Sequence, residues 1–226
     1  MVKILNTIHE DYHIHSLNYS DWLNTIDEIV QYAGKIGMKK IIITDHSQAT
    51  IDKNWLAKKN RRTSIKRRKN VHNDVEVAFG IEWDLLDEEG NCCFDLQWME
   101  SDFCILSCHY WIYQWNLKNI TQAYINAIHK YHDKIKFIGH ICKRKTSEYL
   151  DGEAVAKVLN QYQIPIEINC SSLARAWTDL EKLDTFLSLI EAGVYVNSDL
   201  HVLNDFYTRQ LWFDYIKNMF KRKKNK

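Results

Sequence analysis

Proline and glycine are scarce in this chain of 226 residues, which has one proline and seven glycines. We find no linker rich in these residues, no low-complexity segment and no internal repeat, so the pattern favours one domain. An uncharged apolar run of roughly 18 residues is also missing, and the start lacks a signal-peptide pattern. We therefore expect a cytoplasmic protein with a single domain over residues 1–220 and a basic tail over 221–226.

Cysteine motifs are missing as well. The six cysteines show no CxxC spacing, and we expect reduced thiols packed in the core rather than disulfides. They are Cys92, Cys93, Cys104, Cys108, Cys142 and Cys170.

A net charge of +1 hides an uneven distribution. The segment from Lys53 to Asn70 holds nine Lys and Arg residues and no acid, and residues 221–226 hold five more. Such segments bind polyanions in some proteins and are solvated helix faces or frayed tails in others. Both readings stay open.

Short apolar runs rich in Ile, Val and aromatic residues recur along the chain and predict strands. They occupy residues 11–15, 40–44, 75–82, 103–109, 135–140, 164–169 and 194–199. Segments with helical periodicity lie between them, at 20–37, 120–132, 152–163 and 180–193. In the first of these, Ser20 is a candidate N-cap and Gly37 a candidate C′ residue. Alternating strands and helices predict an α/β fold with parallel strands, and about seven strands favour a closed or nearly closed barrel.

Every apolar run ends in, or just before, a side chain able to bind a metal ion. The series comprises His13, His15, Asp45, His46, Glu82, His109, His140, Glu167, Asn169, Asp199 and His201. In a barrel of parallel strands the C-terminal ends meet at one mouth, so these residues are expected to converge there. His129 and His132 fall outside the series, and we expect them on the surface.

The donor types indicate more than one ion. Imidazoles mixed with carboxylates suit Zn, Mn or Fe, whereas a structural zinc or Fe–S site would need a thiolate cluster. The series exceeds the three or four protein ligands of one catalytic ion. Two or three ions sharing a bridging carboxylate fit better, and paired ions clamp the oxygens of a phosphoryl group.

The ordered motifs HxH, TDH, GIE, SxH, IGH, ExN and SDxH resemble the polymerase-and-histidinol-phosphatase (PHP) superfamily of metal-dependent phosphoesterases. The resemblance runs from His13 to His201 and implies a distorted (β/α)7 barrel with its metal site at the C-terminal ends of the strands. It assigns His13, His15, Glu82 and Asp199 to one ion. Glu82 would bridge to a second ion bound by His109 and His140, and His46 and His201 would bind a third.

The sequence departs from the family pattern in two places. Family members usually carry a further histidine after HxH, where this chain has LNYSDW (residues 17–22). Asp21 can replace that ligand, or the third ion is lost; both alternatives stay open. The frequent HP dipeptide is replaced here by His140-Ile141.

We expect hydrolysis of a phosphate ester, with Asp45, Glu82, Asp199 and His201 as the catalytic set. Asp45 is expected to orient His46, since ligating histidines usually donate their second N–H to a carboxylate or carbonyl. Asn169 and Arg175 are candidate contacts of the substrate phosphate; for Arg175 a surface salt bridge is an equal alternative.

Three functions compete. A small-molecule phosphomonoesterase resembling histidinol-phosphate phosphatase leads. A nuclease or nucleotide phosphodiesterase, binding nucleic acid through the basic segment 58–70, is the alternative. A metal-binding domain without catalysis is a minor third. Aromatic residues in HYWIYQW (Trp111, Tyr113 and Trp115) do not decide, because they fit both a stacking surface and packing.

Overall fold

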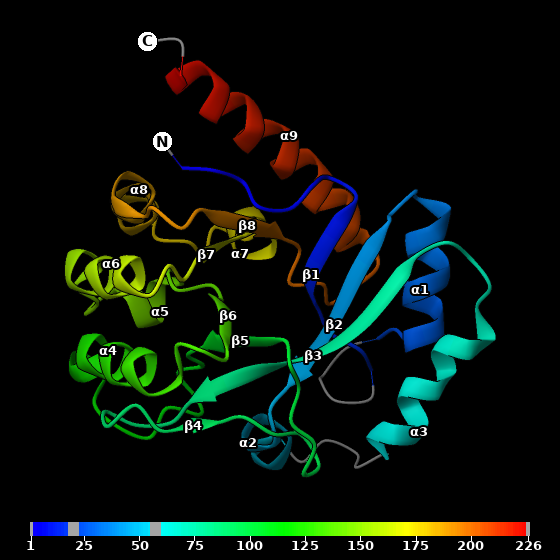
Figure 1. Cartoon of the computed structure of the whole chain (residues 1–226), viewed down its shortest axis with the longest axis horizontal. Coiled ribbons are helices and arrows are strands. Elements are labelled where there is room, and N and C mark those ends of the chain that lie inside the picture. Colours follow the sequence, from blue (N-terminus) through cyan, green and yellow to red (C-terminus); the bar gives the residue numbers. More distant parts are fainter. Residues whose placement is uncertain (1, 18–22, 55–59, 225–226) are drawn as a thin grey trace.

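Seven parallel strands surround the centre of the molecule (Figure 1). The structure is a computed structural model and describes residues 2–17, 23–54 and 60–224. The strands, in the order in which they pair, are β1 (Glu10–Ile14), β2 (Lys40–His46), β3 (Glu76–Leu85), β5 (Cys104–Ser107), β6 (Ile135–Ile138), β7 (Ile166–Asn169) and β8 (Val194–Asn197). A short β4 (Cys92–Cys93), which the sequence did not indicate, pairs antiparallel with β3.

The sheet is nearly closed where β1 meets the end of β8. Beyond the regular ladders, a parallel bridge joins Ile14 and Leu200. The Leu200 N–H donates to the His13 carbonyl at 3.2 Å, and the His15 N–H donates to the Leu200 carbonyl at 3.1 Å. The predicted (β/α)7 barrel is thereby confirmed, and the two ends of the sheet meet at the HxH motif.

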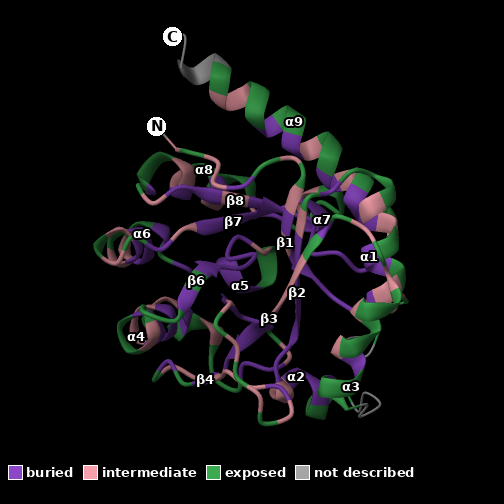
Figure 2. Ribbon diagram, turned by 45° about the vertical axis from the view of Figure 1, so that its right-hand side comes forward, coloured by how far each residue is buried: buried purple, intermediate pink, exposed green. Residues whose placement is uncertain are grey.

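Helices cover the outside of the barrel, and the strands are buried beneath them (Figure 2). They are α1 (Ile26–Lys35), α2 (Gln48–Lys53), α3 (Arg61–Ile65), α4 (Ile120–Tyr131), α5 (Arg144–Ser147), α6 (Gly152–Gln161), α7 (Cys170–Ala174), α8 (Leu180–Leu189) and α9 (Asn204–Lys224), with 3₁₀ segments at Lys66–Asn70 and Leu117–Asn119. Helix α9 runs through Lys224, so most of the basic segment 221–226 continues this helix. The single-domain expectation stays a prediction.

The first helix starts later than its periodicity suggested. Ser20 lies outside the described residues, and α1 begins at Ile26 with Thr25 as its N-cap. The Glu28 carboxylate accepts from the Thr25 backbone N–H at 2.8 Å and from its hydroxyl at 2.9 Å. Both bonds run to the Glu28 carboxylate and hold the chain at the helix start, so Thr25 is the N-cap rather than Ser20. Gly37 has φ +79° directly after the helix, which confirms it as the C′ residue.

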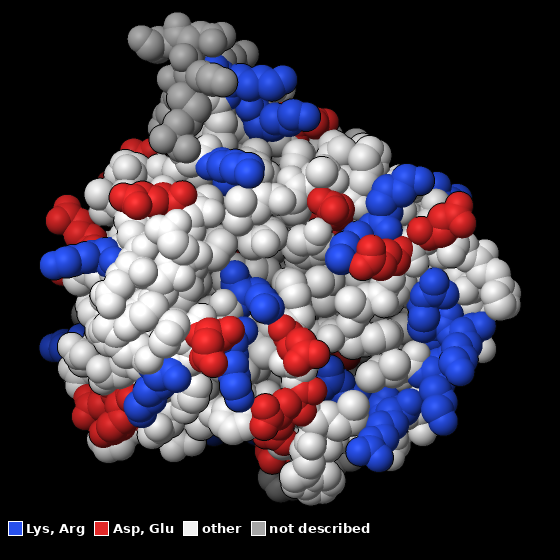
Figure 3. Space-filling view, viewed as in Figure 1, with Lys and Arg blue, Asp and Glu red and all other residues white. Residues whose placement is uncertain are grey.

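The basic segment that suggested nucleic-acid binding is held against the barrel, as far as it is described. Arg61 is buried and donates to the Gly80 carbonyl at 2.7 Å. Arg67 forms a bidentate pair with Asp27 at 2.7 and 2.9 Å. Arg68 donates to two nearby backbone carbonyls. The cations of this region gather along one edge of the molecule (Figure 3), and these three arginines fasten α3 and the following 3₁₀ segment to α1 and β3.

Two further expectations concern side-chain surroundings. All six cysteines are free, and five are buried, with Cys93 half-buried. Burial raises the pKa of the Cys108 thiol, in keeping with an unreactive core thiol.

His129 and His132 are exposed, as predicted. Over the described residues, none of the helices combines the length and the apolar character that a membrane span requires.

Arg209, on α9, joins the two ends of the sheet through its hydrogen bonds. It is 1% exposed. Its guanidinium donates to the carbonyls of Val196 on β8, Ile8 and Thr7 at 2.9 Å each, and also to the carbonyl of Glu10 on β1. One side chain therefore satisfies four backbone acceptors from both ends of the sheet.

Replacing Arg209 with methionine should destabilise the fold strongly. The change removes one donor from four carbonyls, of which those of Val196 and Glu10 keep the Asn6 amide and that of Thr7 keeps the Glu10 N–H. It also removes the cation 3.6 Å from the buried Asp11 carboxylate. We expect a loss of about 3–5 kcal/mol in the free energy of unfolding, measured by urea denaturation. Arg62→Met, at an exposed position of α3, is the matched control and should stay within about 0.5 kcal/mol of the wild type. Equal stability of the two variants would contradict the role of Arg209.

Candidate metal centre

A buried carboxylate, Glu82, lies at the centre of the barrel mouth. It is 0% exposed and belongs to β3. Five imidazoles from four other strands or strand ends approach its two oxygens. The nitrogen–oxygen distances are 3.3 Å for His13, 3.5 Å for His15, 2.8 Å for His46, 3.6 Å for His109 and 2.8 Å for His140. The convergence expected from the strand ends is therefore present.

Strand geometry explains how these side chains reach one point. His13 and His15 stand two residues apart at the end of β1, so both rings point to the same side and lie 5.1 Å apart. His140 and Asp199 follow β6 and β8 with positive φ values of 24° and 52°, which are uncommon for residues other than glycine. Such strain is typical of functional sites, where the surroundings fix a side chain in place.

Three groups of ligand atoms lie close enough together to hold metal ions. The groups, each with all its ligand atoms within 4.8 Å of one another, are His13 with His15 and Asp199, His15 with His46 and Glu82, and Glu82 with His109 and His140. Within the described part of the chain, Nε2 of His13, Nδ1 of His46 and Oε2 of Glu82 are buried and make no hydrogen bond. His46 Nδ1 lies 2.8 Å from that oxygen, yet the pair does not form a hydrogen bond. Buried polar atoms that make no hydrogen bond are costly, and a cation would satisfy them. The donor set of imidazole and carboxylate fits a divalent metal ion.

The electrostatics of the site also favour a cation. Burial alone would raise the pKa of Glu82, but the imidazoles of His109 and His13 hold it well below its usual range. Burial alone would lower the pKa of His13, but the carboxylates of Glu167 and Glu82 raise it well above its usual value. By contrast, burial and the neighbouring His46 lower the pKa of His15 to about 4. The carboxylates thus stay ionised and attract positive charge, whether a proton or a metal ion carries it.

Two buried carboxylates orient candidate ligand histidines by pairing with the ring nitrogen that does not face Glu82. Asp84 accepts from Nδ1 of His109 at 2.6 Å, and Glu167 accepts from Nδ1 of His13 at 2.8 Å. In the neutral ring each pairing keeps the proton on Nδ1, so that Nε2, which faces Glu82, can bind a metal ion. Sequence reasoning missed Asp84 and left Glu167 among the possible ligands. The alternation in β3 offered a signal, since Asp84 lies two residues after Glu82 and shares its side of the strand.

Asp45 and Asn169 make hydrogen bonds that the sequence did not indicate, and their expected roles stay predictions. The Asp45 carboxylate accepts from the backbone N–H and hydroxyl of Ser16 at 2.6 and 3.0 Å, so it anchors the chain after HxH. Burial raises the pKa of Asp45 to about 6. The Asn169 amide donates to both Glu167 and Asp199 at 3.0 Å, which favours a positioning role over contact with substrate.

The ligands expected for a third ion are only partly brought together. His46 joins His15 and Glu82, but His201 is in none of the three groups formed by the described residues. The His201 ring lies beside Asp199, with Nδ1 3.5 Å from Oδ1 of that carboxylate. Asp21 lies outside the described residues. The arrangement therefore fits the ligands expected for the first two ions more closely than those expected for the third ion.

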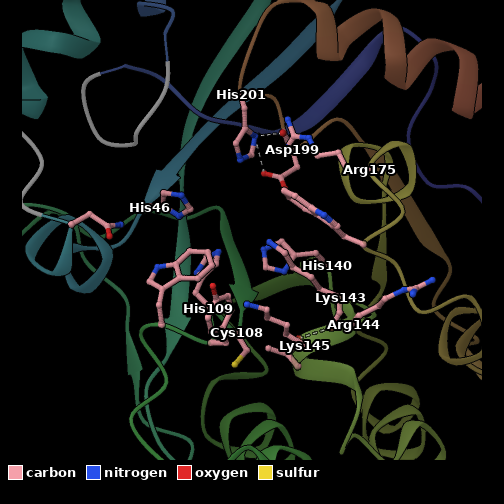
Figure 4. A pocket seen from close by; sticks show the side chains of 15 residues that line it. His46, Cys108, His109, His140, Lys143, Arg144, Lys145, Arg175, Asp199 and His201 are labelled. Atoms are coloured by element: carbon pink, nitrogen blue, oxygen red, sulfur yellow. Dashed lines mark hydrogen bonds and ion pairs between the residues drawn. The ribbon is translucent and has the colours of Figure 1, made fainter.

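A cavity of about 430 Å³ opens beside these groups and is lined by His46, His109, His140, Asp199 and His201, among others. Figure 4 shows His46, Asp199 and His201 on one side of it and Lys143, Arg144 and Lys145 on the other. Arg175 also lines it, with its guanidinium 5.1 Å from the Trp177 ring. Among the described residues Arg175 makes this cation–π contact and no salt bridge. The three basic residues after His140 were not expected from the sequence.

The aromatic residues of HYWIYQW divide between the cavity and the rest of the fold. Trp111 lines the cavity, with its ring 4.9 Å from that of the ligand His109. Tyr110, which the sequence analysis did not single out, also lines it. Tyr113 packs in the core, and Trp115 is exposed. One of the three expected aromatics therefore reaches the candidate site.

A (β/α)7 barrel with buried groups of histidines and carboxylates at its mouth has the architecture of a barrel protein with a metal site at the C-terminal ends of its strands. The sequence model of the PHP domain matches residues 11–171, and the chain belongs to this family. It is accordingly a hydrolase that acts on phosphate esters. The resemblance carried by the ordered motifs is thus confirmed.

Two known proteins are similar to this chain over most of its length. Over 207 residues the chain is 26% identical to a protein of Shewanella piezotolerans named a probable phosphatase, with 87% of this chain and 80% of that protein covered. A solved structure of histidinol phosphate phosphatase from Lactococcus lactis, complexed with zinc, L-histidinol and phosphate, matches with a TM-score of 0.54. That match covers 91% of this chain and 92% of the other at 14% identity, and it shows a shared fold.

Removing the carboxylates behind the histidines should weaken metal binding without unfolding the barrel. Asp84→Ala frees the Nδ1 atom of His109, and Glu167→Ala frees that of His13. We expect each variant to bind Zn²⁺ about 10–100-fold more weakly, measured by competition with a chelator. Asp133→Ala, at an exposed position, is the control. Wild-type zinc affinity in both variants, with circular dichroism unchanged, would show that these carboxylates do not position the ligands.

Proposed function

We propose that this protein hydrolyses the phosphate monoester of a small molecule. One observation carries the proposal: a cavity of about 430 Å³ is lined by members of all three candidate metal groups, namely Asp199, His46, His109 and His140, and by basic residues. Its volume lies in the range of pockets for small ligands. Mixed aromatic and cationic walls suit a compact phosphorylated molecule. The similarity to a protein named a probable phosphatase supports the same reaction class.

We assign the metal ligands by the proximity of their donor atoms. His13, His15 and Asp199 would hold one ion, and Glu82, His109 and His140 a second. A third would rest on His46, with His201 and Asp21 as the remaining candidates. Zn, Mn and Fe all suit this donor set. When bound, such ions supply positive charge to the phosphoryl oxygens and lower the pKa of water.

The remaining site residues bind and orient. Asp84 and Glu167 hold His109 and His13 in one tautomer, so their Nε2 atoms stay available as ligands. Asn169 steadies the Asp199 carboxylate through its amide N–H. Asp45 fixes the start of the loop after HxH through Ser16. Arg175 and His201 line the cavity and are the candidate contacts for the substrate phosphate from outside the metal groups.

The nuclease alternative loses its main support in this structure. It rested on the basic segment 58–70, of which residues 60–70 are described. Arg61, Arg67 and Arg68 are engaged by the protein itself. The cations at the cavity wall come instead from the short stretch after His140 and from Arg175. These observations favour a small substrate over a polymer bound along the α3 edge.

His13→Ala combined with His15→Ala should abolish hydrolysis of phenyl phosphate. The double change removes two imidazoles from one metal group and one from the next. We expect metal content to fall and kcat/KM to drop at least about 100-fold, because ions of this kind supply several kcal/mol of charge stabilisation. Elemental analysis and phosphate release are measured on one preparation.

His129→Ala with His132→Ala is the matched control, since both histidines are exposed on the outside of the barrel. That variant should keep the metal content and turnover of the wild type. Undiminished turnover in the His13/His15 variant would refute the assignment of the site. A wild-type protein that is loaded with Zn, Mn or Fe and hydrolyses no phosphate monoester would refute the proposed function.

A further inference from the structure

Two lysines on the cavity wall have no acidic partner. Lys143 and Lys145 line the cavity from the start of α5. Across the residues that the structure describes, neither ammonium lies within ion-pair distance of a carboxylate, whereas Arg144 between them donates to the Thr178 carbonyl at 3.3 Å. The acids nearest the barrel mouth, among them Glu82, Asp84, Glu167 and Asp199, are engaged with imidazoles. The charge of these two lysines is therefore uncompensated.

Aromatic faces hold both lysines at the wall. The Lys143 ammonium lies 5.7 Å from the centre of the Trp111 ring and 5.4 Å from that of Trp177. The Lys145 ammonium lies 4.0 Å from the Tyr110 ring centre. A cation–π contact is weaker than a charge-assisted hydrogen bond to carboxylate or phosphate. An incoming anion can thus bind either lysine without breaking an ion pair.

The lysines lie beside the metal groups rather than within them. Trp111 contacts the ligand His109 with its ring 4.9 Å away, and the same indole contacts Lys143. A scissile phosphate bound at the metal groups would therefore place its leaving group along Trp111, toward the lysines. Charge at this position discriminates between leaving groups, because like charges repel and opposite charges attract in a partly enclosed cavity.

We infer that the substrate is a phosphate monoester whose leaving group carries a second anionic group, a carboxylate or a second phosphate, bound by Lys143 and Lys145. This inference rests on the proposed function. It sets the protein apart from an enzyme for amino-alcohol phosphates, whose protonated amine the two lysines would repel. Tyr110, Trp111 and Trp177 would line the path between the two anionic groups of the substrate.

Phosphonate analogues test the inference by binding, without turnover. The probes are benzylphosphonate, 4-carboxybenzylphosphonate, 1,4-xylylenediphosphonate and 4-(aminomethyl)benzylphosphonate, titrated calorimetrically into the zinc-loaded protein. We expect at least one of the two probes that carry a second anionic group to bind about tenfold or more tightly than benzylphosphonate. One charge-assisted hydrogen bond provides a gain of this size. The aminomethyl probe should bind more weakly than benzylphosphonate. The affinities of 4-carboxybenzylphosphonate and 1,4-xylylenediphosphonate show whether a carboxylate or a phosphonate is preferred as the second anion.

Lys143→Gln combined with Lys145→Gln should reduce this preference to a ratio near one. Lys136→Gln with Lys157→Gln, at exposed positions on β6 and α6, is the matched control and should keep it. Equal affinity of the wild type for benzylphosphonate and for both probes with a second anionic group, or an unchanged preference in the Lys143/Lys145 variant, would overturn the inference. Hydrolysis of phenyl phosphate is measured separately, and its absence would refute the proposed function instead.

Discussion

An ionised carboxylate buried in the protein interior is the constraint on which this structure depends. Glu82 is inaccessible to solvent, and a buried charge is costly unless it is paired and hydrogen-bonded. The barrel meets this cost by bringing imidazoles from β1, β2 and the ends of β5 and β6 to the two oxygens. Because those imidazoles also face other acids, the site as a whole attracts cations. Ions that bind the folded chain would therefore add to its stability.

The same constraint explains the layer of residues behind the ligands. An imidazole that binds a metal through Nε2 carries its proton on Nδ1, and an acceptor there favours and orients this tautomer. Asp84 and Glu167 provide the acceptor for His109 and His13. Asp84 in turn accepts from the hydroxyls of Ser47 and Thr50 at 2.6 and 2.9 Å. The site is thus fixed by rigid strands and by hydrogen bonds that reach the first turn of α2.

Much of the fold and the primary ligand set could be predicted from sequence because both follow from local regularities. Alternation places His13 and His15 on one side of β1, and parallel strands bring all C-terminal ends to one mouth. The carboxylates behind the ligands could not be assigned, since spacing does not tell which imidazole nitrogen faces Asp84 or Glu167. The Asn169 amide contacts Glu167 on its own strand and Asp199 after β8. The second contact joins segments 30 residues apart, and only the folded structure reveals it.

Charge patterns in the sequence were a poorer guide than strand ends. The run around Arg61 and Arg67 suggested a polyanion site, yet these side chains stabilise the packing of α3 and the following 3₁₀ segment. The shorter run from Lys143 to Lys145 was not predicted to form part of a site, yet it lines the cavity. The difference lies in the availability of partners: Asp27 and backbone carbonyls satisfy the first run, whereas aromatic rings hold Lys143 and Lys145.

The central claim is that the groups around Glu82 bind divalent metal ions on which phosphoesterase activity depends. Its most direct test is a reconstitution titration, in which protein stripped by a chelator receives Zn, Mn or Fe stepwise while bound metal and release of phosphate from phenyl phosphate are measured together. We predict that activity is absent from the stripped protein and rises with binding until more than one ion per chain is held. Full activity in the stripped protein, or saturation of metal binding with no activity for any of the three metals, would contradict the claim.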